Sequence, residues 1–167
     1  MPPRLDQTDR RILKELQADG RITNLALSSR VGLSPPPCLR RVRALEEAGV
    51  VTGYTALVDE KALGFPLTAF TLVRLHSQSE ADLNAFENRV LGWALVREAY
   101  MLSGESDYIL RCLAPDLETF QDFVLRQLTA APNVASVKTN VAIRRAKLAP
   151  GVPVVVAEPA AAPSSKR

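Results

Sequence analysis

Residues 32–49 read GLSPPPCLRRVRALEEAG, and this stretch decides the fold because three prolines stand directly before a segment with helical periodicity. Proline inside a helix removes a backbone hydrogen bond and costs roughly 3 kcal/mol, whereas the first helical turn has no such bond to lose. The stretch therefore predicts a helix capped by Ser34. We expect the first two prolines to stay extended, so that the regular helix begins near Pro37 or Cys38.

The segment after the prolines has one apolar face and one cationic face. Its apolar residues recur at helical spacing and form a single stripe: Cys38, Leu39, Val42 and Leu45. Arg40 points nearly opposite to that stripe, with Arg41 and Arg43 on either side. Arginine suits contact with a polyanion, because its planar guanidinium bonds guanine or phosphate with two N–H groups at once. The alternative interpretation is a solvated charged surface.

The prolines also change what the capping residue does. A serine cap normally accepts hydrogen bonds from the second or third backbone N–H of its helix. Pro36 and Pro37 have no N–H, so the Ser34 hydroxyl is free for another partner, and a phosphate oxygen is a suitable one.

Two further helices precede this one along the chain. Asp6 and Asp9 have the spacing of a reciprocal cap and predict a first helix over residues 6–18. Thr23 then caps a second, short helix that Gly32 ends.

The segment after the third helix completes a recognisable motif. VVTGYTALVD at residues 50–59 predicts a two-stranded ribbon that turns near Gly53. Three short helices followed by such a ribbon form a winged helix-turn-helix, in which the third helix enters the DNA major groove and the second crosses the phosphate backbone.

The remainder of the chain alternates between strand and helix periods and predicts a ferredoxin-like β-α-β-β-α-β order. The six segments are LTAFTLVRLH (67–76), SEADLNAFENRVL (79–91), ALVREAYMLSG (94–104), DYILRCLA (107–114), DLETFQDFVLRQLTA (116–130) and VASVKTNVAIRR (134–145). We therefore expect an α+β protein with four parts: a winged helix-turn-helix domain (1–58), a linker (59–65), a ferredoxin-like domain (66–148) and a disordered Pro/Ala-rich basic tail (149–167).

Composition and charge fit a soluble, cytoplasmic protein with a nucleic-acid partner. Hydrophobic residues make up 47% and charged residues 23% of the chain, and no apolar run suggests a membrane span or signal sequence. Residues 1–50 hold nine Lys or Arg against six Asp or Glu, residues 51–143 hold seven against eleven, and residues 144–167 hold five against one. A basic N-terminal third beside an acidic middle indicates one module that faces a polyanion and another with a different task.

The cysteines and the histidine do not suggest a metal site or a disulfide. Cys38 and Cys112 lie in apolar patterns without CxxC spacing, and His76 is the sole histidine. We expect both cysteines to be small buried hydrophobic residues, with no cofactor and no metal.

The segments LDQTDRRILKELQADGRITNLALSSRVGLSPPPCLRRVRALEEAGVVTGYTALVD and SGESDYILR closely resemble the Lrp/AsnC family of transcription regulators, within its leucine-responsive branch. The resemblance covers about residues 4–148. It implies a DNA-binding homodimer that assembles to tetramers or octamers and whose C-terminal domain binds an amino acid. The expected DNA-binding residues are Arg30, Ser34, Pro36, Arg40, Arg41 and Arg43. Pro36 stands where this branch usually has threonine, which removes one hydroxyl from the DNA surface.

The loop LSGESDYIL is the candidate effector site. Backbone N–H groups near Ser103 and Gly104 suit a carboxylate, and Asp107 suits an ammonium group, as a zwitterionic amino acid requires. A plain polar hairpin turn is the alternative. The resemblance implies a pocket formed by this loop together with the last strand of an adjoining subunit, at these matching positions: Leu102, Gly104, Asp107, Leu117, Asn140 and Val141. Asn140 replaces an aromatic residue of the leucine-responsive branch, so the effector stays open.

Two other function classes are compatible with parts of the sequence. Ser103, Glu105 and Asp107 could form a catalytic cluster, but no motif places His76 or another base beside them. The protein could instead be an architectural DNA-binding protein of the nucleoid or a stand-alone amino-acid sensor.

Overall fold

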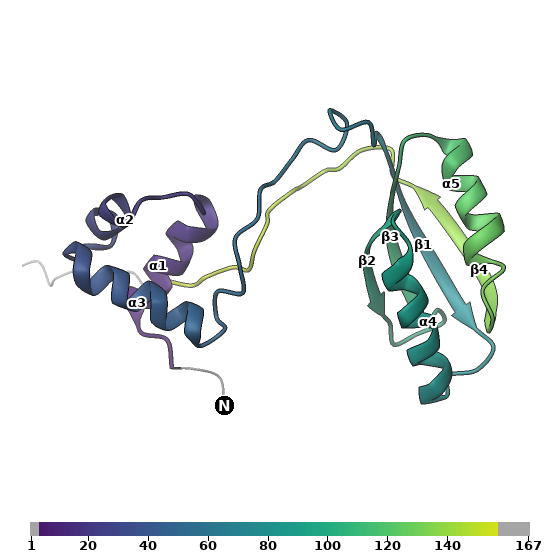
Figure 1. Ribbon diagram of the computed structural model, residues 1–167, viewed down its shortest axis with the longest axis horizontal. Helices are drawn as coiled ribbons and strands as arrows, with labels where there is room; N and C mark the ends of the chain where they lie inside the picture. Colours follow the sequence, from purple (N-terminus) through teal and green to yellow (C-terminus); the bar gives the residue numbers. More distant parts are fainter. Residues whose placement is uncertain (1–3, 157–167) are drawn as a thin grey trace, which may run out of the picture. The chain divides into compact units, whose positions relative to one another are not determined.

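The computed structural model describes residues 4–156, which form two compact units (Figure 1). Residues 4–57 and 148–156 belong to the first unit, and Val58–Lys147 form the second. Within residues 4–156, no helix is both long and apolar enough to cross a bilayer. The final residues of the expected tail, 157–167, lie outside the described part of the chain.

Three helices pack around one core in the first unit: α1 (Gln7–Ala18), α2 (Asn24–Val31) and α3 (Pro35–Glu47). The core residues are Ile12, Leu27, Val31, Cys38 and Leu45. The predicted cap of α1 is confirmed, because Asp6 accepts from the Asp9 N–H and Asp9 accepts from the Asp6 N–H. The Asp9 N–H, and to a lesser degree Arg41, hold the pKa of Asp6 below its ordinary value.

The start of α3 differs from the prediction in one respect. Ser34 is the cap and its side chain makes no capping hydrogen bond, as expected. However, α3 begins at Pro35, so the expectation that the first two prolines stay extended is wrong. The reason is that the proline ring fixes φ near its helical value and the first turn needs no N–H donors. The three prolines are therefore a rigid first turn of the helix.

The predicted ribbon of residues 50–59 does not form among the described residues. Gly49 has a φ of 67° and ends α3 with bonds that also use the next two residues: the Val50 and Val51 N–H groups both donate to the Leu45 carbonyl. These donors are then unavailable to a strand ladder. The remaining residues, 52–59, are exposed and too few for two strands.

The second unit is a four-stranded antiparallel sheet with helices on one face (Figure 1). Its elements are β1 (Leu67–Leu75), α4 (Glu80–Gly92), β2 (Val96–Met101), β3 (Tyr108–Ala114), α5 (Leu117–Phe123), the π-helical turn η1 (Val124–Leu128) and β4 (Val134–Val141). The strand order β2-β3-β1-β4 confirms the ferredoxin-like arrangement. Burial alternates along β1 and β3, so one sheet face packs on the helices and the other stays open.

Aromatic side chains form part of the core of this unit. Phe86 of α4 packs against Trp93 and Tyr108, and burial raises the pKa of the Tyr108 phenol to about 12.

Sequence periodicity predicts one continuous helix from Asp116, but the π-helical turn inserts an extra residue after Phe123. This shift brings Leu128 into the core instead of the preceding glutamine.

Cys38 and Cys112 are buried free thiols, as predicted. Burial raises the pKa of the Cys112 thiol to about 11 and also raises that of Cys38. Both side chains therefore stay protonated and serve as small apolar residues.

The two caps of the helix-turn-helix should respond differently to the same substitution. The Thr23 hydroxyl accepts the Ala26 N–H at 3.2 Å, so Thr23→Ala should cost about 1 kcal/mol of stability. Ser34→Ala should cost less than about 0.5 kcal/mol, because the Ser34 hydroxyl caps nothing. Amide hydrogen exchange across α1–α3 measures both losses, and equal losses would contradict the free hydroxyl.

Candidate functional site

The outer face of α3 carries three of the predicted DNA-binding residues in one line. Pro36, Arg40 and Arg43 are spaced by four and three residues, so they share a helical face, and all three are exposed. Neither Arg40 nor Arg43 forms an ion pair with another residue of the range 4–156. Their guanidinium groups are therefore available to an anionic partner. The exposed Ser34 adds a free hydroxyl at the N-terminus of the same helix.

The other two predicted arginines are engaged inside the unit. Arg41 donates to Asp6 and to Asp9, each at 2.7 Å, and thereby joins α3 to the capped start of α1. Arg30 donates to Glu15 at 2.9 Å and joins α2 to α1. These contacts hold the helices in register, so Arg41 orients the face that carries Arg40.

A side chain that the sequence did not single out fixes the start of α3. Asn24, in the first turn of α2, donates from Nδ2 to the Pro35 carbonyl at 2.9 Å. Asn24 Oδ1 is buried and has no hydrogen-bond partner within residues 4–156. A buried oxygen without a hydrogen-bond partner costs free energy. The Asn24 amide nevertheless stays buried, where its Nδ2 joins the start of α2 to the start of α3.

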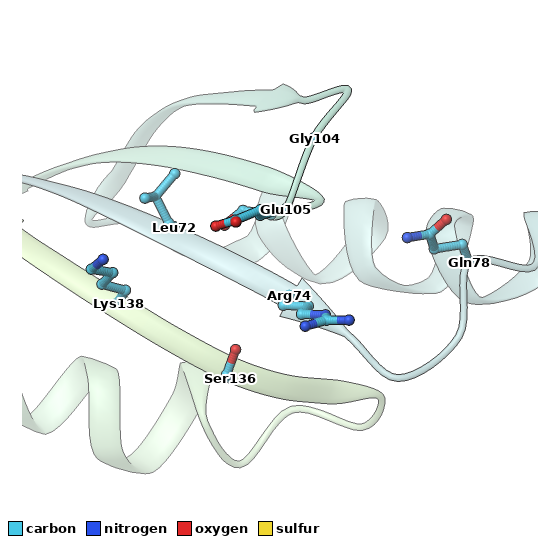
Figure 2. Close-up of a pocket in the computed structure, with 8 residues that line it drawn as sticks. Leu72, Arg74, Gln78, Gly104, Glu105, Ser136 and Lys138 are labelled. Carbon is cyan, nitrogen blue, oxygen red and sulfur yellow. The ribbon is translucent and has the colours of Figure 1, made fainter.

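A pocket of about 470 Å³ lies on the open face of the sheet in the second unit (Figure 2). Leu72 and Arg74 come from β1, and their register partners Lys138 and Ser136 come from β4. Gln78 follows β1, and the loop Gly104–Ser106 closes the pocket from the β2–β3 side.

The pocket combines opposite charges with an apolar patch. Arg74 and Lys138 present cations, Glu105 presents a carboxylate, and Leu72 presents an aliphatic side chain. Such a set matches a small molecule that carries both an anionic and a cationic group. Arg74 and Lys138 interrupt the apolar character of their strands, and this signal could have been used to find them from sequence.

Asp107 is placed differently from the sequence-based expectation. Its side chain is buried, with the residue only 5% exposed. One carboxylate oxygen accepts the Leu75 N–H and the other accepts the Gln78 amide, both at 2.6 Å. Asp107 therefore positions Gln78, which lines the pocket, and ties the loop to the end of β1.

The six predicted effector residues separate into two groups within one chain. Leu102, Gly104 and Asp107 lie at the end of β1 where Val73 pairs with Tyr108. Asn140 and Val141 pair with Phe70 and Ala69 towards the other end of β1, and Leu117 begins α5 at that same end. Only Gly104 of the six lines the pocket. The two groups do not meet in a single subunit.

Residues named under the catalytic alternative are also dispersed. Glu105 lines the pocket, whereas both oxygens of Asp107 are bonded to protein donors. His76 follows the end of β1, where its backbone N–H donates to the Asn133 carbonyl. Among residues 4–156, no group of three His, Cys, Asp or Glu could hold a metal ion.

A helix-turn-helix with a cationic outer face, joined to a sheet with a charged pocket, defines a ligand-responsive DNA-binding regulator. Winged helix-turn-helix DNA-binding domains match residues 5–52, and the Lrp/AsnC ligand binding domain matches residues 68–152. The chain belongs to the Lrp/AsnC family. The predicted family, the α+β fold class and the assignment as a DNA-binding transcriptional regulator are thereby confirmed.

Relatives agree along most of the chain. It is 58% identical over 143 residues to the leucine-responsive regulatory protein of Rhizobium meliloti, which covers 86% of this chain and 92% of the relative. It is 37% identical to the transcriptional regulator AzlB of Bacillus subtilis, over 90% of this chain and 96% of that protein.

Solved structures of transcriptional regulators have the same fold as this chain. A transcriptional regulator of Neisseria meningitidis in complex with L-Met superposes with a TM-score of 0.86 at 37% identity and covers 90% of this chain and 97% of its own. An AsnC family regulator from Agrobacterium tumefaciens superposes with a TM-score of 0.85 at 33% identity, over 89% of this chain and 97% of its own.

Asp107 should be important for stability as well as for the site. Asp107→Ala leaves the Leu75 N–H without an acceptor and should destabilise the second unit by about 1–3 kcal/mol. Asp107→Asn keeps an oxygen for that N–H and should cost less. Trp93, the single tryptophan, reports on this unit in urea unfolding followed by fluorescence. Identical unfolding of wild type and the Ala variant would disprove the positioning role.

Proposed function

We propose that the protein regulates transcription in response to an amino acid that binds in the charged pocket on the open sheet face. The observation that carries this proposal is that Arg74, Lys138 and Glu105 line one pocket beside the Gly104 loop. The family relationship and the L-Met complex of the Neisseria meningitidis regulator support it.

The ligand's two charged groups would bind opposite sides of the pocket. The α-carboxylate would accept hydrogen bonds from Arg74 and Lys138, and the ammonium group would donate to Glu105. Gln78, oriented by Asp107, would contact the polar end, and Leu72 would lie against the side chain. Recognition of the zwitterion by charge leaves the choice of side chain to the apolar part of the pocket.

We further propose that the chain works as a homodimer that assembles to tetramers or octamers. The open face of the sheet exposes large apolar side chains, including Phe70 at 38% and Tyr100 at 57%. A face of this kind is typical of an interface between subunits. Leu117, Asn140 and Val141 lie away from the Gly104 loop, so a second subunit would have to bring them to one site.

DNA binding would use the outer face of α3. Arg40 and Arg43 would contact base edges or phosphates, with Ser34 and Pro36 at the N-terminal end of the helix. Arg30 and Arg41 would contribute positive charge while they hold α2 and α3 against α1.

Chromosomal DNA as the partner implies a cytoplasmic, nucleoid-associated protein. We propose no catalytic role for Ser103, Glu105 or Asp107, since the relatives are transcriptional regulators.

A thermal-shift screen followed by Trp93 fluorescence tests the effector assignment. A bound amino acid at a hundredfold excess over its Kd should stabilise the protein by about 2.7 kcal/mol, and L-methionine is the first probe. Glu105→Gln should weaken binding by about tenfold or more, because the ammonium group loses its charged acceptor. Glu118→Gln, an exposed change on α5, is the matched control.

Two results would count against this assignment. No shift with any amino acid at millimolar concentration would refute an amino-acid effector. An equal shift in Glu105→Gln and wild type would place the ligand elsewhere.

Arginine substitutions test the DNA-binding surface. Arg40→Ala should weaken operator binding by about 1–3 kcal/mol without changing stability, because Arg40 has no ion pair within residues 4–156. Arg41→Ala should lower the stability of the first unit, because it removes the link to Asp6 and Asp9. Arg89→Ala on the second unit is the exposed control, and fluorescence anisotropy with labelled operator DNA at fixed salt measures affinity. Unchanged affinity of the Arg40 variant would remove it from the interface.

A further inference from the structure

The segment after the ligand domain returns to the DNA-binding unit. Residues 148–156 belong to the same compact unit as α1–α3 (Figure 1). The Val152 N–H donates to Gln17 Oε1 at 2.6 Å, in the last turn of α1. This is a specific contact in a segment whose composition predicts disorder.

Gly151 fits this contact for two independent reasons. Its φ is 83°, a conformation that residues with a Cβ rarely adopt. A Cβ placed on Gly151 would also come within 1.9 Å of Gln17 Oε1 and 2.8 Å of Gln17 Cδ. The Gln17 side chain therefore lies against the Gly151 backbone and would have to move away from an added Cβ.

The surroundings of this contact form an apolar pocket that the returning segment helps to enclose. A cavity of about 450 Å³ is lined by Leu13 and Leu16 of α1, by Tyr54 and its neighbours, and by Pro150 and Val152. Tyr54 is itself held by a 2.8 Å hydrogen bond to Glu46 at the end of α3. The returning segment, α1 and Tyr54, which is held by the end of α3, therefore line the same pocket.

The local sequence makes such a contact inexpensive in entropy. Gly151 and Val152 stand between Pro150 and Pro153, and each proline restricts the backbone of the free segment. Beyond them, Val154 and Val156 are half-buried whereas Val155 is 74% exposed, as in an extended chain with one face packed. Residues 154–156 therefore have an inner and an outer side, whereas Val152 is 71% exposed.

The stretch between β4 and this segment is anchored on the ligand domain. The Ala142 N–H donates to the Thr68 carbonyl just after β4, and Arg145 pairs with Glu60 at 2.7 Å. Glu60 also pairs with Arg111 of β3, and these arginines lower the pKa of its carboxyl. The chain passes from one unit to the other at Leu57–Val58 and again at Lys147–Leu148, six residues after β4 ends at Val141.

We propose that residues 148–156 are a latch that docks on α1 within the DNA-binding unit, with Gln17 and Gly151 as its contact point. Residues 150–152 of the chain itself thus form one side of the apolar pocket beside α1. The latch gives the ligand domain a second connection to α1, in addition to the linker. Its expected consequence, transmission of effector binding at the sheet to α1, rests on the proposed function, whereas the latch itself does not.

Amide hydrogen exchange of the full chain tests the latch without any ligand. Gly151→Ala and Gln17→Ala should each raise exchange at Val152 by about tenfold, the loss expected for one good hydrogen bond. Both should also raise exchange over residues 13–18 and 50–57. Gly64→Ala is the matched control, since Gly64 has the same φ of 83° but no side chain within 4 Å of its added Cβ. It should leave these segments unchanged.

A chain truncated after Ala149 gives a second, independent measurement. It should show the same faster exchange over residues 13–18 and 50–57 as Gly151→Ala. Unchanged exchange there in the truncated chain, or an equal increase in Gly64→Ala, would overturn the latch.

DNA titrations with and without millimolar L-methionine test the consequence. Gly151→Ala should keep the wild-type thermal shift with L-methionine and lose the change in DNA affinity that L-methionine causes in wild type. A full wild-type change in affinity in this variant would overturn the transmission. If wild type shows no thermal shift, the proposed effector fails, while the exchange measurements still decide the latch.

Discussion

The packing of α3 against α1 and α2 is the constraint on which the DNA-binding surface depends. Cys38 and Leu45 are buried in the three-helix core, and helical geometry then turns Arg40 to the opposite side. Arg41 lies between these faces and is held by Asp6 and Asp9, the same carboxylates that cap α1. The cap of one helix therefore also fixes the rotation of another, and the exposed arginines follow from that rotation.

The proline run belongs to the same constraint. A helix that begins with three prolines has a first turn with little conformational freedom, and Asn24 holds the carbonyl of the first of them. The missing N–H groups leave the Ser34 hydroxyl without a capping role. Rigidity and a free hydroxyl thus come from one feature, at the end of α3 that a helix-turn-helix turns towards DNA.

In the second unit, the alternation of side chains along β1 and β3 places core residues on one face of the sheet and pocket residues on the other. The inner face carries the apolar core, including Val73, Leu110 and Cys112. The outer face carries Leu72, Arg74 and Lys138, and with the Gly104 loop it forms the pocket. Arg74 can occupy the central strand β1 because it faces away from the helices, and Lys138 lies on the edge strand β4. The segment after β4 then continues from this sheet to α1.

The sequence by itself determined much of the local structure. The capping positions Asp6, Thr23 and Ser34 and the end of α2 at Gly32 follow from short-range rules, as does the order of strands and helices along the second unit. Only the tertiary structure decided which charged groups are paired and which are free. Arg40 and Arg41 are adjacent and chemically identical, yet Asp6 and Asp9 bind only the second of them. Asp107, Gln78 and Leu75 meet for the same reason, as do Gln17 and Gly151. Their contacts join residues far apart in the chain, and such proximity depends on how whole elements pack, which local periodicity does not encode.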